Sequence, residues 1–118
     1  MNRDIRDRYE TRARIMKALG QPTRMFIVDQ LSQKNRCVHE LTEMIGADTS
    51  TVSKHLSILK ESGIVDFAKS GTQINYRLVT PCVLDFFSCL ENMVRFNVQR
   101  QMSCLRGCQD LESDSQKE

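Results

Sequence analysis

The sequence predicts a mostly α-helical fold that carries a single β-hairpin, and three observations support this class. A short helix and a longer helix follow each other across a glycine-containing turn within residues 38–62. Two strands separated by a tight turn are expected in residues 64–78. Amphipathic helical patterns lie at both ends of the chain, in residues 4–19 and 80–105. We therefore expect one domain in residues 1–108 and an acidic, disordered tail in residues 109–118.

The first predicted helix, residues 4–19, is rich in arginine. Its apolar residues recur at helical spacing and are Ile5, Tyr9, Ile15, Met16 and Leu19. Basic residues are frequent throughout residues 1–36, whereas the last ten residues are acidic and hold a single lysine. This asymmetry suits an anionic partner, although basic runs are also common on ordinary solvated surfaces.

Residues 38–62 have the layout of a helix-turn-helix. The first helix is predicted at residues 38–45, where Val38, Leu41, Met44 and Ile45 share its inner face. Gly46 stands where a helix C-cap needs a positive φ, and Asp48 or Thr49 stands where the next helix needs an N-cap oxygen. Two helices joined by a short turn that contains glycine form this motif.

The second helix, residues 49–62, has the features of a DNA recognition helix. Its buried face is predicted to hold Val52, Leu56 and Leu59, with Ile58 beside them. Its first turns carry the small hydroxyl and basic side chains Ser50, Thr51, Ser53, Lys54 and His55. In a helix-turn-helix these turns enter the major groove, so we expect these five residues to contact DNA. An ordinary surface helix would have a similar polar face, so the neighbouring segments decide between the two.

The segment after Gly63 is predicted to form a β-hairpin. Strands are expected at residues 64–68 and 73–78, with a tight turn at residues 70–72. Lys69 near the tip and Arg77 on the second strand are candidate phosphate contacts. A hairpin with a few basic residues is also a common solvated edge.

The recognition-helix pattern carries a family resemblance. The pattern Ser-x-x-Ser-x-His-Leu-x-x-Leu at Ser50, Ser53, His55, Leu56 and Leu59, followed by Asn-Tyr-Arg-Leu in the second strand, resembles the winged-helix repressors of the ArsR/SmtB family. The resemblance runs from about residue 17 to residue 78. It implies a winged helix-turn-helix homodimer, joined through its first and last helices. It also implies a bacterial repressor that leaves its double-stranded DNA operator when an inducer, typically a metal or metalloid ion, binds elsewhere on the dimer.

The last predicted helix, residues 80–105, is more apolar than one small domain can cover. We therefore expect Phe86, Leu90 and Met93 to lie at the dimer interface. The alternative is that this helix packs back on its own subunit.

The cysteines are the candidate sensing residues. Five cysteines, an odd number without a paired framework, fit a reducing compartment. The family's Cys-Val-Cys inducer motif corresponds to Cys37-Val38-His39, so one thiolate is retained and His39 replaces the second. The family's zinc site on the last helix is missing, because Thr80, Cys82, Met93 and Phe96 stand at the ligand positions.

Cys104 and Cys108 form a thiol pair near the end of the last helix. Residues four apart lie one helical turn apart, close enough to chelate a soft ion or, if the turn at Gly107 relaxes, to form a disulfide. With Cys37 they give a three-thiolate site for arsenite or cadmium, and His39 is a fourth ligand for zinc. Cys82 and Cys89 lie among apolar residues of the last helix, where a buried cysteine is more often a small inert hydrophobe.

Two other functions use the same thiols. One is a redox or persulfide sensor of the same fold that forms a Cys-Cys disulfide. The other is a small Cys-x-x-x-Cys thiol enzyme, which the sequence disfavours because it has no phosphate-binding glycine loop and both histidines lie in the helix-turn-helix. We therefore do not expect an enzyme. Without a secretory signal or an apolar run of ~20 residues, we expect a cytoplasmic protein that does not bind membranes.

Overall fold

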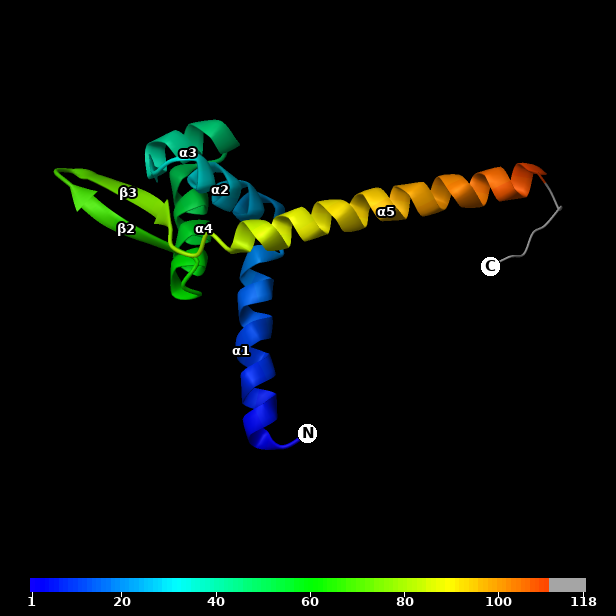
Figure 1. Cartoon of the computed structure of the whole chain (residues 1–118). Helices are drawn as coiled ribbons and strands as arrows, with labels where there is room; N and C mark the ends of the chain where they lie inside the picture. The colour runs from blue at the N-terminus through cyan, green and yellow to red at the C-terminus, as the bar shows by residue number, and fades with distance from the viewer. Residues whose placement is uncertain (111–118) are drawn as a thin grey trace. The chain divides into compact units, whose positions relative to one another are not determined.

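The computed structural model describes the backbone of residues 1–110 and the side chains of residues 1–105 (Figure 1). The chain forms two compact units, residues 1–81 and a second unit that begins at Cys82. The first unit contains α1 (Arg3–Leu19), α2 (Pro22–Gln33), β1 (Arg36–Cys37), α3 (Val38–Ile45), α4 (Thr49–Glu61), β2 (Val65–Ser70) and β3 (Gln73–Leu78). The second contains α5 (Val83–Asp110). The predicted class, mostly α-helical with one β-hairpin, is confirmed.

The core of the first unit is built from aliphatic side chains of α2, α3 and α4. Those with no exposed surface are Ile27, Val28, Leu41, Val52, Leu56 and Leu59. Burying each such side chain stabilises the fold by about 1.5–3 kcal/mol. The predicted inner face of α4 is thus confirmed for Val52, Leu56 and Leu59. Ile58, expected beside them, keeps 39% of its surface exposed.

The helix ends follow the predicted capping residues. Gly46 ends α3 with φ 80°, in the left-handed region that glycine enters without strain. Asp48 caps α4, because its Oδ1 accepts a hydrogen bond from the Thr51 backbone N–H at 2.9 Å. Gly63, with φ 81°, lies just beyond α4, as predicted. These caps fix the turn between α3 and α4.

The sheet has three antiparallel strands in the order β1-β3-β2. The sequence did not predict β1, in which Arg36 pairs with Tyr76 and Cys37 with Asn75. The hairpin is also longer than predicted, because Ser70 pairs with Gln73 and belongs to β2. The chain reverses over only two residues, which the φ of 66° at Gly71 permits.

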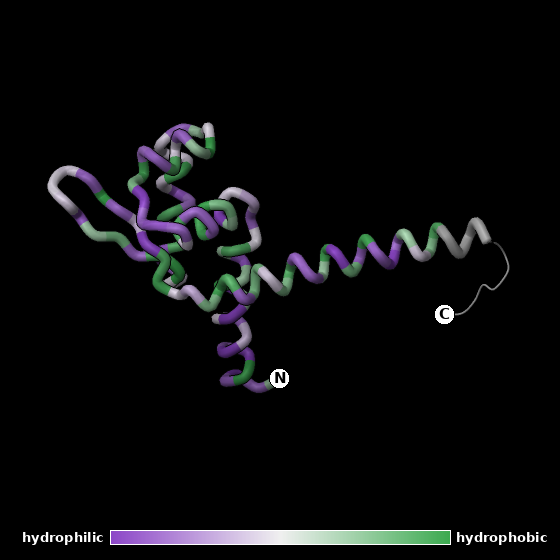
Figure 2. The backbone as a smooth tube through the Cα atoms, turned by 45° about the horizontal axis from the view of Figure 1, so that its top comes forward, coloured by the Kyte–Doolittle hydropathy of each residue, from purple (hydrophilic) through white to green (hydrophobic). Residues whose placement is uncertain are grey.

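The α5 helix begins at Val83, three residues later than predicted, and continues to Asp110 instead of ending at residue 105. Pro81 explains why Thr80 lies outside the helix, because the residue before a proline is disfavoured in helical conformation. Hydrophobic and hydrophilic segments alternate along α5 (Figure 2). None of the described helices is long and apolar enough to cross a membrane. Residues 109 and 110 belong to α5, and the rest of the predicted acidic tail lies outside the described residues.

Candidate DNA-binding surface

The α4 helix separates its apolar and polar side chains. Val52 and Leu56 have no exposed surface and anchor the helix in the core. Ser50, Thr51 and Lys54 are exposed on its first turns, whereas Ser53 and His55 are half-buried. The predicted contact residues therefore form two groups, one open to any partner and one partly held by the protein.

The Asp48 carboxylate organises the beginning of α4. Its Oδ1 accepts the Thr51 backbone N–H and lies 3.5 Å from the Ser50 hydroxyl, which can donate to it. Hydrogen bonds from Thr51 lower the pKa of Asp48, and the nearby charge of Lys54 contributes a smaller effect in the same direction. The helix thus begins with an ionised carboxylate. The sequence did not predict that the Ser50 hydroxyl has this intramolecular partner.

The His55 side chain is hydrogen-bonded to Arg24, a residue that the sequence did not single out as functional. The Nη1 of Arg24, at the start of α2, lies 3.1 Å from the His55 Nδ1. The pKa of His55 is lowered, mainly by burial of the imidazole and then by the charge of Arg24. Arg24 belongs to the Gln-Pro-Thr-Arg segment that begins α2, and no periodic pattern links it to His55.

The hairpin of β2 and β3 carries the two residues predicted to contact phosphate, and they differ in whether an acidic side chain pairs with them. Lys69 is exposed and faces Ile74 across the hairpin. Arg77 is paired with Asp66 on the neighbouring strand, with Nη2 and Oδ2 3.6 Å apart. Asp66 also accepts the Phe67 backbone N–H at 2.7 Å. Lys69 is therefore the freer cation of the two.

An aromatic pair connects the hairpin to α4. Phe67 and Tyr76 face each other across β2 and β3, with ring centroids 5.5 Å apart. The Lys60 ammonium, near the end of α4, lies 5.0 Å from the Phe67 ring centroid. Burial raises the pKa of Tyr76. These contacts connect the hairpin to the end of α4.

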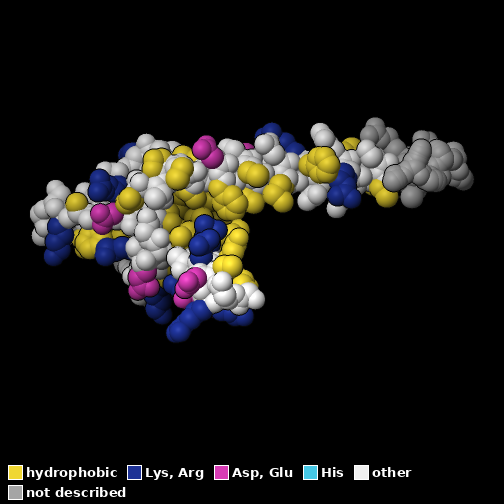
Figure 3. Space-filling view, turned by 60° about the horizontal axis from the view of Figure 1, so that its bottom comes forward, with side chains coloured by type: hydrophobic (Ala, Val, Ile, Leu, Met, Phe, Trp, Pro, Cys, Tyr) yellow, Lys and Arg dark blue, Asp and Glu magenta, His cyan; other side chains and the backbone are white. Residues whose placement is uncertain are grey.

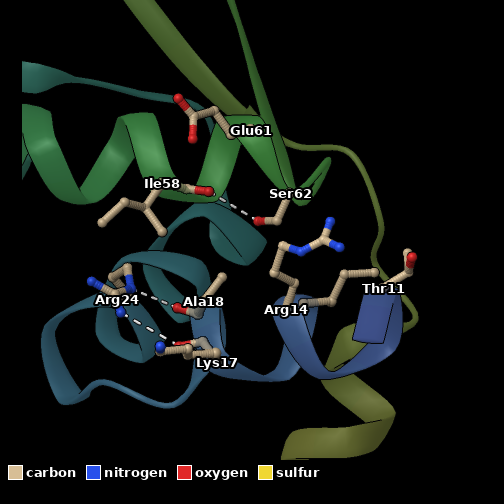
Figure 4. A pocket seen from close by; sticks show the side chains of 9 residues that line it. Thr11, Arg14, Lys17, Ala18, Arg24, Ile58, Glu61 and Ser62 are labelled. Carbon is tan, nitrogen blue, oxygen red and sulfur yellow. Dashed lines mark hydrogen bonds between the residues drawn. The ribbon is translucent and has the colours of Figure 1, made fainter. Parts of the chain in front are cut away.

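A pocket of about 380 Å³ lies between α1 and α4 (Figure 4). It is lined by Thr11, Arg14, Ile15, Lys17, Ala18, Arg24, Ile58, Glu61 and Ser62. The partly exposed Ile58 forms part of this wall, which explains why it is not in the core. The pocket lies between the arginine-rich α1 and the last turns of α4.

Cys37 is a buried residue at the N-cap of α3, with 9% of its surface exposed. Its backbone N–H donates to Glu40 Oε1 at 3.0 Å, and this hydrogen bond is the main cause of the lowered pKa of Glu40. His39, the predicted fourth zinc ligand, is exposed and lies 3.2 Å from the Glu43 carboxylate. The thiol and the imidazole of this segment therefore differ sharply in accessibility.

The other thiols lie on or beside α5. Cys82, Cys89 and Cys104 are exposed and free. Cys108 is part of the α5 backbone, but its side chain lies outside the described residues. Within residues 1–105, no group of three or more His, Cys, Asp or Glu is arranged to hold a metal ion. The predicted site of Cys37, Cys104 and Cys108 spans the two units and stays a prediction.

The predicted interface residues on α5 differ in exposure. Phe86 and Leu90 are half-buried, whereas Met93 keeps 55% of its surface exposed. Apolar exposure continues toward the end of the helix, with Phe96 at 60% and Met102 at 56%. Hydrophobic side chains are visible along this segment in Figure 3. The apolar stripe of α5, formed by these side chains, is therefore available to a partner.

Comparison with known proteins identifies the family of this fold. Residues 21–66 match the model of the bacterial regulatory proteins of the arsR family. The chain is 44% identical over 64 residues to the transcriptional repressor SmtB of Mycobacterium tuberculosis, a match that covers 54% of this chain and 47% of SmtB. It thus spans about half the length of that relative. It is 34% identical over 88 residues to the regulator MJ1325 of Methanocaldococcus jannaschii, covering 74% of this chain and 99% of MJ1325.

Solved structures agree with this assignment. The repressor BigR from Xylella fastidiosa has 33% identity and a TM-score of 0.65, and the match covers 79% of this chain and 96% of BigR. The homodimeric winged helix-turn-helix domain of Mb0332 from Mycobacterium bovis has 26% identity and a TM-score of 0.72, covering 85% of this chain and 93% of that domain. With its α3–α4 motif and its β2–β3 wing, this chain belongs to the arsR family of winged helix-turn-helix regulatory proteins.

Proposed function

We propose that the protein is a transcriptional repressor that binds a double-stranded DNA operator as a homodimer and leaves it when a thiol-reactive inducer binds. The observation that carries the DNA-binding step is the polarity of α4. Val52, Leu56 and Leu59 are fully buried, while the exposed polar residues crowd its first turns. That arrangement suits entry of the helix N-terminus into a major groove, with base-edge contacts for specificity and phosphate contacts from Lys69.

The homodimer is proposed from the apolar surfaces of α1 and α5. Tyr9 and Met16 on α1 keep 55% and 57% of their surface exposed, and Phe96 on α5 keeps 60%. Covering such stripes with a second copy removes apolar surface from water and adds a two-fold axis. Two recognition helices ~34 Å apart would then read successive major grooves of an imperfect palindrome. The homodimeric state of the Mb0332 domain supports this assembly.

For the inducer we propose a soft metal or metalloid ion, with arsenite as the first candidate and cadmium or zinc as others. Exposed Cys104 and its neighbour Cys108 would capture the ion, and Cys37 of either subunit would complete a three-thiolate site. Because Cys37 is buried at the N-cap of α3, ligation would have to open the start of that helix. Since α3 packs on α4, opening the start of α3 would bias the dimer toward a form with poor DNA affinity. A coupling free energy of ~1–3 kcal/mol between ion binding and DNA binding is sufficient to weaken operator binding several-fold to a hundredfold.

A redox or persulfide sensor is the second candidate. It is favoured by the exposure of Cys82, Cys89 and Cys104, because accessible thiols are the ones that oxidants reach. In this alternative a Cys-Cys disulfide replaces the bound ion. The thiol enzyme remains the least supported function, and turnover of a small disulfide substrate would be its signature. Either sensor is proposed to act in the cytoplasm.

One experiment tests both steps of the proposal. Reduced protein, purified without oxygen, is used to select sites from a random double-stranded DNA library, and binding to the selected duplex is compared with a scrambled duplex by fluorescence anisotropy. We expect strong preference for a palindromic site. Arsenite, cadmium, zinc, peroxide and polysulfide are then added in turn. Equal binding to both duplexes would overturn the repressor proposal, and release by peroxide or polysulfide alone would replace the metal inducer with the redox sensor.

A further inference from the structure

The Arg24 side chain joins three helices of the first unit. Its Nε donates to the Ala18 carbonyl at 2.6 Å, and its Nη2 donates to the Lys17 carbonyl at 3.4 Å, both at the end of α1 (Figure 4). Its Nη1 reaches His55 Nδ1 on α4 at 3.1 Å. Arg24 itself lies in the first turn of α2, where its backbone N–H donates to the Gln21 side chain at 2.8 Å. The guanidinium is therefore held in place from several directions.

This contact determines which nitrogen of His55 carries the proton. A guanidinium has only donors, so Nδ1 of His55 must accept the hydrogen bond from Arg24. In a neutral imidazole the hydrogen then resides on Nε2. The lowered pKa of His55, caused by burial and then by Arg24, keeps the ring neutral near pH 7. His55 thus presents a single N–H donor, at Nε2.

The Nε2 atom is available to an external partner. It has no hydrogen-bond partner within the described part of the chain. It is also not fully buried, because Thr42 Oγ1 is the one buried side-chain polar atom without a partner among the described residues. Nε2 of His55 is therefore reached by solvent. A half-buried ring with one exposed N–H is suited to a fixed acceptor at the protein surface. A DNA phosphate oxygen is such an acceptor, because phosphates flank the groove that α4 would enter.

We propose that Arg24 is a positioning residue for operator binding, which holds His55 in the Nε2–H form so that the ring donates to a DNA phosphate oxygen. The inference rests on the DNA-binding role of α4 proposed above. It assigns His55 to phosphate contact, while sequence-specific contacts are left to the other polar residues in the first turns of α4. The same guanidinium donates hydrogen bonds to the Ala18 and Lys17 carbonyls near the end of α1. Arg24 therefore also links the His55 side chain to the arginine-rich helix.

The first arm of the test needs no DNA. Protein labelled with 15N-histidine is examined by NMR through the two-bond couplings of each imidazole, which distinguish Nδ1–H from Nε2–H. We expect the Nε2–H form for His55 in the wild type and a mixture of forms in Arg24→Gln. Arg14→Gln is the matched control, because Arg14 lines the same pocket but makes none of these hydrogen bonds. A wild-type ring in the Nδ1–H form, or unchanged tautomers in Arg24→Gln, would overturn the proposal.

The second arm measures DNA affinity with the selected duplex and the scrambled duplex. A hydrogen bond to a charged group predicts roughly tenfold weaker binding for Arg24→Gln and for His55→Ala, on both duplexes alike. Arg24→Gln should cause no further loss when combined with His55→Ala, because both changes remove the same contact. Arg24→Lys, which keeps a cationic donor, should recover part of the affinity. Additive losses in the double variant would show a merely structural role for Arg24.

The two arms also separate this inference from the DNA-binding proposal. If wild-type protein binds no DNA while His55 is in the Nε2–H form, the DNA-binding role of α4 fails and the positioning role fails with it. If wild-type protein binds its selected duplex but the tautomer of His55 does not depend on Arg24, the positioning role alone is wrong. Circular dichroism of each variant checks the fold. If Arg24→Gln does not fold, the tautomer of the wild type and the affinity of Arg24→Lys, expected between those of wild type and His55→Ala, still test the proposal.

Discussion

Asp66 and Arg77 face each other across the wing as a direct cross-strand pair, with their charged groups 3.6 Å apart. Both side chains are largely exposed, at 47% and 60%, so solvent screens the pair and it adds little stability. Its larger effect is on the charge that the wing offers to DNA. If the wing contacts DNA as proposed, the Asp66 carboxylate would compete with phosphate for the Arg77 guanidinium, while Lys69 on β2 has no such competitor within the hairpin.

The wing can therefore be tested with a pair of substitutions. Asp66→Asn should strengthen binding to all duplexes alike and steepen the salt dependence, because Arg77 is freed to meet phosphate. Lys69→Ala should weaken binding to all duplexes and reduce the salt slope by ~1. Affinities measured over a series of salt concentrations check both. A change in sequence preference, with an unaltered slope, would contradict the phosphate assignment.

Base contact by the first turns of α4 predicts a position-dependent loss. Ser53→Ala should reduce affinity for the selected operator by about 1–3 kcal/mol if Ser53 makes a good base contact, with a smaller change for the scrambled duplex. Ser57→Ala is the matched control, since it is the same change one turn farther from the helix N-terminus. Anisotropy with both duplexes gives the comparison. Equal losses for the two variants would argue against Ser53 as a base contact.

Assembly through α5 predicts that one charge in the apolar stripe is disruptive. Leu90→Asp should dissociate or unfold the dimer, because an unpaired carboxylate would be buried at the interface. Asn92→Asp adds the same charge at an exposed position of the same helix and should leave assembly unchanged. Sedimentation at micromolar concentration measures the outcome. A monomeric wild type would exclude the proposed dimer at that concentration.

The environment of His55 predicts a pH dependence of stability. Its pKa in the folded protein is lower than the ordinary value of 6.5, so the unfolded chain takes up the proton first as pH falls. The free energy of unfolding should therefore decrease below pH ~6.5, and His55→Gln should remove this part of the decrease. Urea unfolding at a series of pH values measures it. Arg24→Gln should raise the pKa of His55, although burial would still keep it low.

The thiol site is tested by a double substitution. Replacing Cys104 and Cys108 together with serine should abolish release of DNA by the inducer and leave the affinity of the uninduced protein unchanged. Cys89→Ser, which removes an exposed thiol of the same helix, is the control. Operator release is titrated with arsenite for each variant. If the double variant still responds at the wild-type concentration, sensing must be sought at Cys37, Cys82 or Cys89.

Features that depend on neighbouring residues in the chain were predicted from the sequence. Gly46, Asp48 and Gly63 mark the ends of α3 and α4 because the conformation or side-chain oxygen required at a cap is a property of that residue. The spacing of Val52, Leu56 and Leu59 predicted the buried face of α4 for the same reason. The polar first turns of the recognition helix follow directly from that face. These local rules were sufficient for the helix-turn-helix and the wing.

Only the tertiary structure decided the features that join distant residues. The two-residue strand β1 exists because β3 pairs with it, and a segment so short has no periodicity of its own. The bond between Arg24 and His55 spans 31 positions, and the pairing of Asp66 with Arg77 depends on the register of the hairpin. Which side chains share a hydrogen bond is set by how helices and strands pack. The sequence therefore determined the buried face of α4 at Val52, Leu56 and Leu59, and the fold determined which of its polar side chains are already held by the protein.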